Sequence, residues 1–153
     1  MRGVGFGSTL RPTAKKILGE VMTLARILVP VRGDGKGEGV IGHAAALARR
    51  LAAHIEAVHC RARPDDMMPY GVAVPAGFRD QIRQQAAAMA DSEEKHLHGL
   101  FDALMAKLGI DVIAPDATPP QDRPSASWCE EQGRQIDVVR AHGRLADLVA
   151  VAR

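Results

Sequence analysis

Cysteine and histidine are the side chains of this sequence best suited to metal binding or nucleophilic chemistry. His96 and His98 lie two residues apart in a predicted helix, so they point about 200° apart and do not share one ion. His59 and Cys60 are neighbours in a predicted strand and point to opposite faces of the sheet. Zinc ligands usually occur as closely spaced pairs in the sequence. Cys129 has no such partner nearby, and only the fold could bring it alongside His59 or Cys60. The sequence therefore predicts no metal site and no catalytic residue.

Two pairs of neighbouring acids, at 65–66 and 93–94, have the residue type that general acid–base catalysis uses. Neighbours in sequence seldom face each other, and a solvated loop and a solvated helix face explain the two pairs. Trp128 falls on a predicted strand, where an indole is expected in the core or at a dimer contact. These side chains do not by themselves predict a reaction.

A glycine-rich turn offers a second kind of chemistry, because Gly37, Gly39 and Gly42 fit the G-x-G-x-x-G pattern of dinucleotide-binding folds. That pattern normally follows its strand directly, whereas residues 32–36 intervene here. The fold also needs an acid at the end of the second strand, and that position holds Cys60 and Arg61. A flexible turn that leads into a helix is the favoured interpretation, and an NAD(P)-dependent enzyme using residues 37–42 is kept as an alternative.

The elements that would position these residues alternate between strand and helix patterns. Residues 24–31 are apolar and rich in β-branched side chains, which predicts a central parallel strand. Apolar spacing of three and four predicts helices, and Gly109 is the expected stop of the longest one. The predicted helices are 40–51, 78–108 and 136–145, and the further strands are 54–60, 110–114, 126–131 and 146–152, the last of them buried. This order predicts an α/β fold with a parallel sheet.

Composition limits the classes of protein that this chain can belong to. With 153 residues, 46% of them hydrophobic, it is long enough for one domain and too short for two. Its 20 basic and 18 acidic residues form no basic block, so no nucleic-acid partner is expected. No apolar run reaches the roughly 20 residues of a membrane span. Two distant cysteines suit reduced thiols in the cytoplasm.

The domain is expected to occupy residues 23–153. Residues 1–22 are glycine-rich and basic at their start and predict a disordered N-terminal extension. Met22 directly precedes the regular part of the chain, and our hypothesis is that it is the physiological start.

Four segments together resemble the universal stress protein family, from about Leu24 to Arg153. They are the opening RILVPV at 26–31, the alanine-rich helix at 44–52, the strand at 54–60 and the closing GRLADLVAV at 143–151. The strand that begins SASW at 125–128 is similar to the subgroup found in tandem two-domain members from proteobacteria.

This resemblance implies a Rossmann-like three-layer parallel sheet that lacks the last strand and helix of the family. In many members ATP binds at the carboxyl ends of the strands, and an acid directly after the first strand touches the adenine side. Here Arg32 stands at that position, Asp34 follows two residues later, and Val58 matches a pocket valine. The family's phosphate loop would follow the final strand, beyond Arg153. The resemblance thus implies a vestigial adenine pocket of Val31, Arg32, Gly33, Asp34 and Val58.

The function expected from the resemblance is a cytoplasmic, non-enzymatic role in the stress response. It would act through regulation or through association with a second universal-stress-type domain or a homodimer partner, without a cofactor of its own. ATP would bind in a complete homologue. The alternatives are an ATP-binding domain whose phosphate loop is supplied elsewhere and the NAD(P)-dependent enzyme described above.

Overall fold

The computed structural model describes residues 24–61, 63 and 75–152. The predicted extension at 1–22, the proposed start at Met22 and the acid pair at 65–66 lie outside these residues. The described strands are β1 (Arg26–Val31), β2 (His54–Arg61), β3 (Asp111–Val112), β4 (Ser125–Gln132) and β5 (Leu148–Val149). The helices are α1 (Gly37–Leu51), α2 (Ala76–Leu108) and α3 (Gln135–Gly143).

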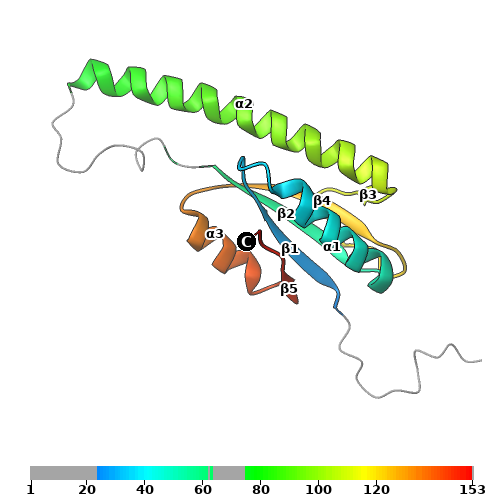
Figure 1. Cartoon of the computed structure of the whole chain (residues 1–153). Coiled ribbons are helices and arrows are strands. Elements are labelled where there is room, and N and C mark those ends of the chain that lie inside the picture. The colour runs from blue at the N-terminus through cyan, green and yellow to red at the C-terminus, as the bar shows by residue number, and fades with distance from the viewer. Residues whose placement is uncertain (1–23, 62, 64–74, 153) are drawn as a thin grey trace, which may run out of the picture.

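The strands form one parallel sheet in the order β3-β4-β2-β1-β5 (Figure 1). The chain steps from β1 to β2 through α1, and it later returns through α3 to place β5 on the other side of β1. The strand order therefore reverses between β1 and β5. In open α/β sheets such a reversal opens a crevice at the carboxyl ends of the strands, where ligands bind. The predicted α/β fold with a central first strand is confirmed.

One face of the sheet is apolar and carries the core. Alternate residues of β1 and β2, such as Ile27, Val29 and Ile55, are fully buried beneath α1 and α2. Helix α1 contributes small side chains, Ala44, Ala45 and Ala48, which let it lie close to the strands.

Helix α2 packs on this face through its C-terminal half only. Leu97, Phe101 and Met105 recur every four residues and are buried, whereas Phe78 and Met89 are 61% and 74% exposed. The first half of the apolar stripe is therefore exposed to solvent. The reason is length: 33 residues of helix span about 50 Å, while an eight-residue strand spans about 26 Å. The helix runs past the sheet in Figure 1, and it ends as predicted at Gly109, with φ of 61°.

The opposite face is covered by α3, which has no buried residues of its own. Strand β5 beside it is an edge strand whose Val149 is 39% exposed. The predicted strand at 146–152 is thus confirmed in position but is shorter, and its predicted burial is wrong, because within the described residues it pairs with β1 alone. None of the described helices combines the length and apolarity needed to cross a membrane.

Candidate functional site

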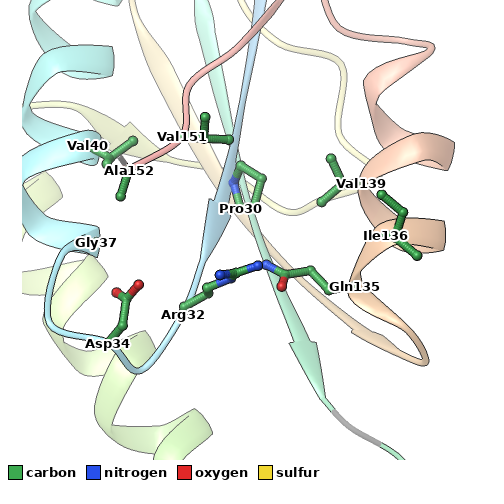
Figure 2. Close-up of a pocket in the computed structure, with 10 residues that line it drawn as sticks. All are labelled: Pro30, Arg32, Asp34, Gly37, Val40, Gln135, Ile136, Val139, Val151 and Ala152. Carbon is green, nitrogen blue, oxygen red and sulfur yellow. The ribbon is translucent and has the colours of Figure 1, made fainter.

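A cleft of about 390 Å³ lies at the reversal point between β1 and β5 (Figure 2). Pro30 helps to open it. The carbonyls of Arg26 and Leu28 accept hydrogen bonds from Asp147 and Ala150 on the β5 side, and Pro30 faces the same side without an N–H. The ladder stops there and the chain diverges. The lining residues are Pro30, Arg32, Asp34, Gly37, Val40, Gln135, Ile136, Val139, Val151 and Ala152.

The polar groups of this cleft gather at its mouth. Figure 2 shows the Arg32 side chain extending toward Gln135, and the Asp34 carboxylate near the start of α1. Asp34 Oδ1 accepts a hydrogen bond of 3.0 Å from the Lys36 backbone N–H. The first turn of α1 begins at Gly37 and presents backbone N–H groups on this side. Arg32 and a helix N-terminus together suit an anionic group such as a phosphate.

The structure separates the residues of the predicted adenine pocket. Arg32 and Asp34 line the cleft. Val31 is 4% exposed and belongs to the core on the α1/α2 face, and Val31, Arg32 and Gly33 together line two cavities against α2. Val58 is buried and does not line the cleft. Of the five predicted positions, the cleft brings together two.

The three glycines of the G-x-G-x-x-G match lie inside α1. A Cβ at Gly39 or Gly42 would meet no atom within 4 Å, so neither glycine is needed for close packing on the strand. The end of β2 carries Arg61, which forms ion pairs with Asp91 and Glu94 of α2. This geometry favours an ordinary helix start over a dinucleotide-binding turn.

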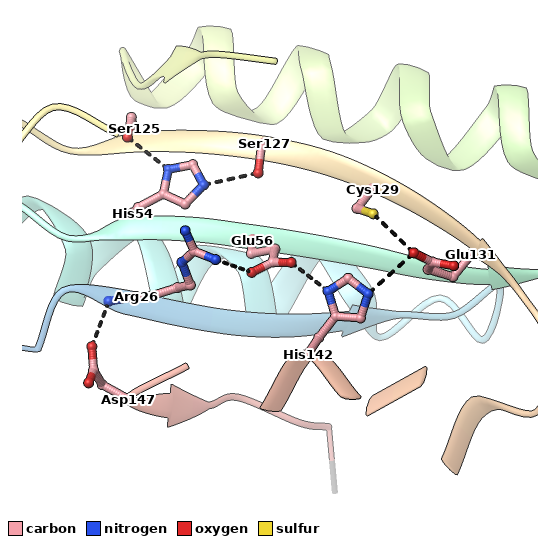
Figure 3. Close-up of polar contacts among 9 residues, drawn as sticks. All are labelled: Arg26, His54, Glu56, Ser125, Ser127, Cys129, Glu131, His142 and Asp147. Carbon is pink, nitrogen blue, oxygen red and sulfur yellow. Dashed lines mark hydrogen bonds and ion pairs between the residues drawn. The ribbon is translucent and has the colours of Figure 1, made fainter. Parts of the chain in front are cut away.

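A second group of polar residues covers the α3 face of the sheet (Figure 3). Buried His54 of β2 contacts two serines of β4, Ser125 Oγ at 2.8 Å and Ser127 Oγ at 2.9 Å. Burial lowers the pKa of His54 to about 4, and the charge of Arg26 adds to this, against a smaller opposing effect of Glu56. His54 is therefore a neutral histidine at neutral pH.

The same face joins α3 to the sheet through charged groups. Glu56 Oε1 accepts a hydrogen bond from His142 Nδ1 at 2.6 Å, and Glu56 Oε2 lies 3.4 Å from Arg26 Nη1. On the other ring edge, His142 Nε2 lies 3.5 Å from Glu131 Oε1, and Cys129 Sγ lies 3.9 Å from the same oxygen. Burial, together with the neighbouring carboxylates, raises the pKa of the Cys129 thiol.

This group of Cys129, Glu131 and His142 was not foreseen from the sequence. The only local signal is the spacing of Cys129 and Glu131, which are two apart on a strand and so face one side of the sheet. His142 comes from a different element, and its contact with Glu56 spans 86 residues of chain. The other histidines considered for metal binding lie elsewhere: His59 of β2 and His98 of α2 each stack on Trp128, and His96 of α2 lines a cavity between α1 and α2.

Two further predictions concern residues on the α1/α2 face of the sheet. Trp128 is 8% exposed and packs against Phe101, so its predicted core position is confirmed. Glu94 was expected on a solvated helix face, but it pairs with Arg61 and lies beside Glu130. Burial raises the pKa of Glu130 to about 7, and the hydrogen bond to Glu94 adds to the shift. The wrong expectation arose because α2 crosses the end of β4, a long-range contact.

No protein-family model matches the sequence. No curated protein matches it significantly. Among solved structures, the universal stress protein UspA from Lactobacillus plantarum superposes with a TM-score of 0.52 at 14% identity, covering 84% of this chain and 76% of that one. A universal stress protein family member from Burkholderia pseudomallei gives 0.45 at 16% identity, covering 86% and 83%.

The chain has the universal stress protein fold. The resemblance predicted from the four sequence segments is thereby confirmed at the level of a UspA-like, Rossmann-like domain. Within this universal-stress-type domain, the cleft occupies the reversal point of the sheet and the Cys129 group occupies the α3 face.

Proposed function

We propose that this universal-stress-type protein serves the stress response in the cytoplasm without catalysis, through association with a second copy of itself. The observation that carries the proposal is the apolar surface around the β5 edge. Exposed apolar side chains come from α3 and from β5 with its flanking residues, at 57% for Ile136, 72% for Leu145, 39% for Val149 and 66% for Val151.

A second copy is the occupant that this edge suits best. An edge strand presents unpaired backbone N–H and C=O groups, and within the described residues β5 pairs on its β1 side only. A two-fold axis beside β5 would bring the same apolar residues of two copies together, since a symmetric interface is self-complementary. Burial of such residues from both copies stabilises the pair by the hydrophobic effect.

The test is the mass of the protein in solution, by sedimentation equilibrium over a range of concentrations. We expect dimers, and we expect Val151→Lys to shift the protein toward monomer. Val112→Lys is the matched control, because Val112 is 46% exposed on β3 at the other edge of the sheet. A monomeric parent protein, or equal effects of the two variants, would contradict association through β5.

A second candidate function is nucleotide binding in the β1–β5 cleft, with a phosphate loop supplied from elsewhere. It is favoured by the position of the cleft at the reversal point and by Arg32 beside the first turn of α1. We expect a calorimetric titration with ATP to show saturable binding, and we expect Arg32→Glu to weaken that binding. Arg50→Glu, an exposed change at the other end of α1, is the control. Tighter binding of NAD or NADP than of ATP would instead support the dinucleotide alternative.

A further inference from the structure

Three side chains on the α3 face have the chemistry and spacing of metal ligands. Cys129 and Glu131 come from β4 and His142 from α3, and one potential ligand atom of each lies within 4.8 Å of the other two. We propose that Cys129, Glu131 and His142 form a binding site for Zn²⁺ or a similar late first-row divalent ion. This proposal is independent of the association through β5 and of the cleft beside it.

Two of the three separations are close to those between the ligands of a tetrahedral ion. Zn–S bonds of about 2.3 Å and Zn–N or Zn–O bonds of about 2.0 Å place neighbouring ligand atoms roughly 3.3–3.5 Å apart. The observed separations are 3.5 Å from His142 Nε2 to Glu131 Oε1 and 3.9 Å from Cys129 Sγ to the same oxygen. The third separation, between Cys129 and His142, is at most 4.8 Å, so side-chain rotations that bring these two ligand atoms together by up to about 1.3 Å would complete the ligand set.

The hydrogen bonding of His142 prepares its other ring nitrogen for an ion. Because Nδ1 donates to Glu56 at 2.6 Å, the neutral ring directs its Nε2 lone pair toward the carboxylate of Glu131. Two acceptors 3.5 Å apart repel each other, and a proton on Nε2 or a metal ion relieves that repulsion. Glu56 is itself held by Arg26 at 3.4 Å. A carboxylate that orients a histidine in this way is typical of zinc sites.

The donor set and the surroundings indicate which ion binds and how. A thiolate, an imidazole and a carboxylate favour zinc, cobalt or nickel over Mg²⁺ and Ca²⁺, which prefer oxygen ligands. A cavity of about 330 Å³ reaches Glu131 and His142 from solvent and gives an ion and a water molecule access. Three protein ligands leave a fourth position for that water. Bound metal would also fasten α3, which has no buried residues, to the sheet.

The experiment uses untagged full-length protein titrated with Co²⁺, whose bond to a thiolate gives a charge-transfer band in the near ultraviolet. We expect the band at one equivalent in the parent protein and in Cys60→Ser, and its loss in Cys129→Ser. Cys60 is the matched control, because it is the other cysteine, is also intermediate in burial, and lies on β2 opposite Glu131 with its thiol on the Gly133 carbonyl, outside the group of three. Zn²⁺ should displace the cobalt, and excess Mg²⁺ should not.

Two further variants separate ligand from positioning residue. Glu131→Gln, at a side chain that is 46% exposed, keeps the fold and should weaken Co²⁺ binding. Glu56→Gln should weaken it by about 10-fold to 100-fold without changing the shape of the band, because Glu56 orients His142 and does not touch the ion. Absence of the band in the parent protein, or its survival in a folded Cys129→Ser, would overturn the proposal. So would unchanged affinity in Glu131→Gln, which would leave a proton as the cation between His142 and Glu131.

Discussion

The two faces of the sheet are built from alternate residues of the same strands, yet the α1/α2 face is mainly apolar and the α3 face carries a network of hydrogen-bonding side chains. Beneath α1 and α2 the strands present Ile27, Val29 and Ile55, all fully buried. One residue along each strand, the α3 face presents Arg26 and Glu56 within a polar network. The first face stabilises the fold through packing, and the second carries hydrogen bonds that depend on protonation and geometry.

This difference has consequences for tolerance to change. Close-packed apolar side chains contribute stability that is lost when volume is removed, and they do not themselves titrate. A polar face can be altered by pH, by ions and by removal of single hydrogen-bond partners. The predictions that follow test this division, first on the apolar face and then on the polar one.

The largest loss of stability is expected from a cavity under α2. Phe101 is 1% exposed and packs against Trp128, with ring centroids 5.4 Å apart. Phe101→Ala should lower the free energy of unfolding by about 3–5 kcal/mol, because a cavity is left in a close-packed region. Urea denaturation measures the change. Leu100→Ala is the control: this neighbour is 53% exposed, and its loss should cost no more than about 0.5 kcal/mol. Similar losses for the two variants would show that α2 is not packed as described.

The second-largest effect is a loss of stability at acidic pH, and it comes from His54 on the α3 face. The pKa of His54 is lowered to about 4 by burial, with Arg26 adding to the shift and Glu56 opposing it, against about 6.5 in an unfolded chain. Between these values the unfolded state binds the extra proton, so stability falls as pH drops from 6.5 to 4. The expected contribution is roughly 3 kcal/mol.

The control for this pH effect is His54→Gln, which keeps groups able to bond to Ser125 and Ser127 but does not titrate. Urea denaturation of both proteins at pH 7 and pH 4 should give a smaller loss of stability in the variant. The carboxylates titrate in both proteins, so their effect on stability cancels when the two pH dependences are subtracted. Parallel pH profiles would mean that His54 is solvated in the folded state.

The same division explains what the sequence could predict. Helix and strand patterns are local, so residues 40–51 and 54–60 predicted α1 and β2 within three residues at each end. The residues predicted for the adenine pocket do not all line the cleft, because side chains alternate along a strand: Val31 belongs to the core and its neighbour Arg32 lines the cleft. Arg32 and Asp34 could be placed at the cleft because they follow the first strand directly.

The polar face could not be predicted in this way. Its contacts join residues far apart in the chain, such as His54 with Ser127 and Glu56 with His142. These pairs depend on the register of β2 with β4, which sets Val58 opposite Cys129, and on the angle at which α3 crosses the strands. No periodicity in the sequence encodes either quantity. The amphipathic pattern of a helix records which side is buried, but not which residue of another element it meets.

A smaller loss is expected where the polar side of the sheet closes at the start of β1. Asp147 Oδ2 accepts hydrogen bonds from the backbone N–H groups of Ala25 and Arg26, at 2.8 and 2.9 Å. These bonds lower the pKa of Asp147. Asp147→Ala should cost about 1 kcal/mol, since the bonds are exposed to solvent. Thermal unfolding at pH 7 measures it, and Asp116→Ala, at an exposed acid in the connection before β4, is the control. Equal melting temperatures for both variants would contradict a role for Asp147.

The smallest effect is a gain, and it lies on the apolar side, where α1 turns into β2. Ala52 has a φ of 54°, a left-handed conformation that costs an alanine energy and a glycine none. Its backbone N–H still bonds to the Ala48 carbonyl, so the turn itself is intact. Ala52→Gly should therefore raise stability by up to about 1 kcal/mol, less the greater entropy of glycine in the unfolded chain. Ala48→Gly, in the buried helical turn before it, should lower stability by at least as much. If Ala52→Gly and Ala48→Gly destabilise the protein equally, the strain relieved at residue 52 is smaller than the entropic cost of glycine. Packing, and not backbone strain, would then set the stability of this face.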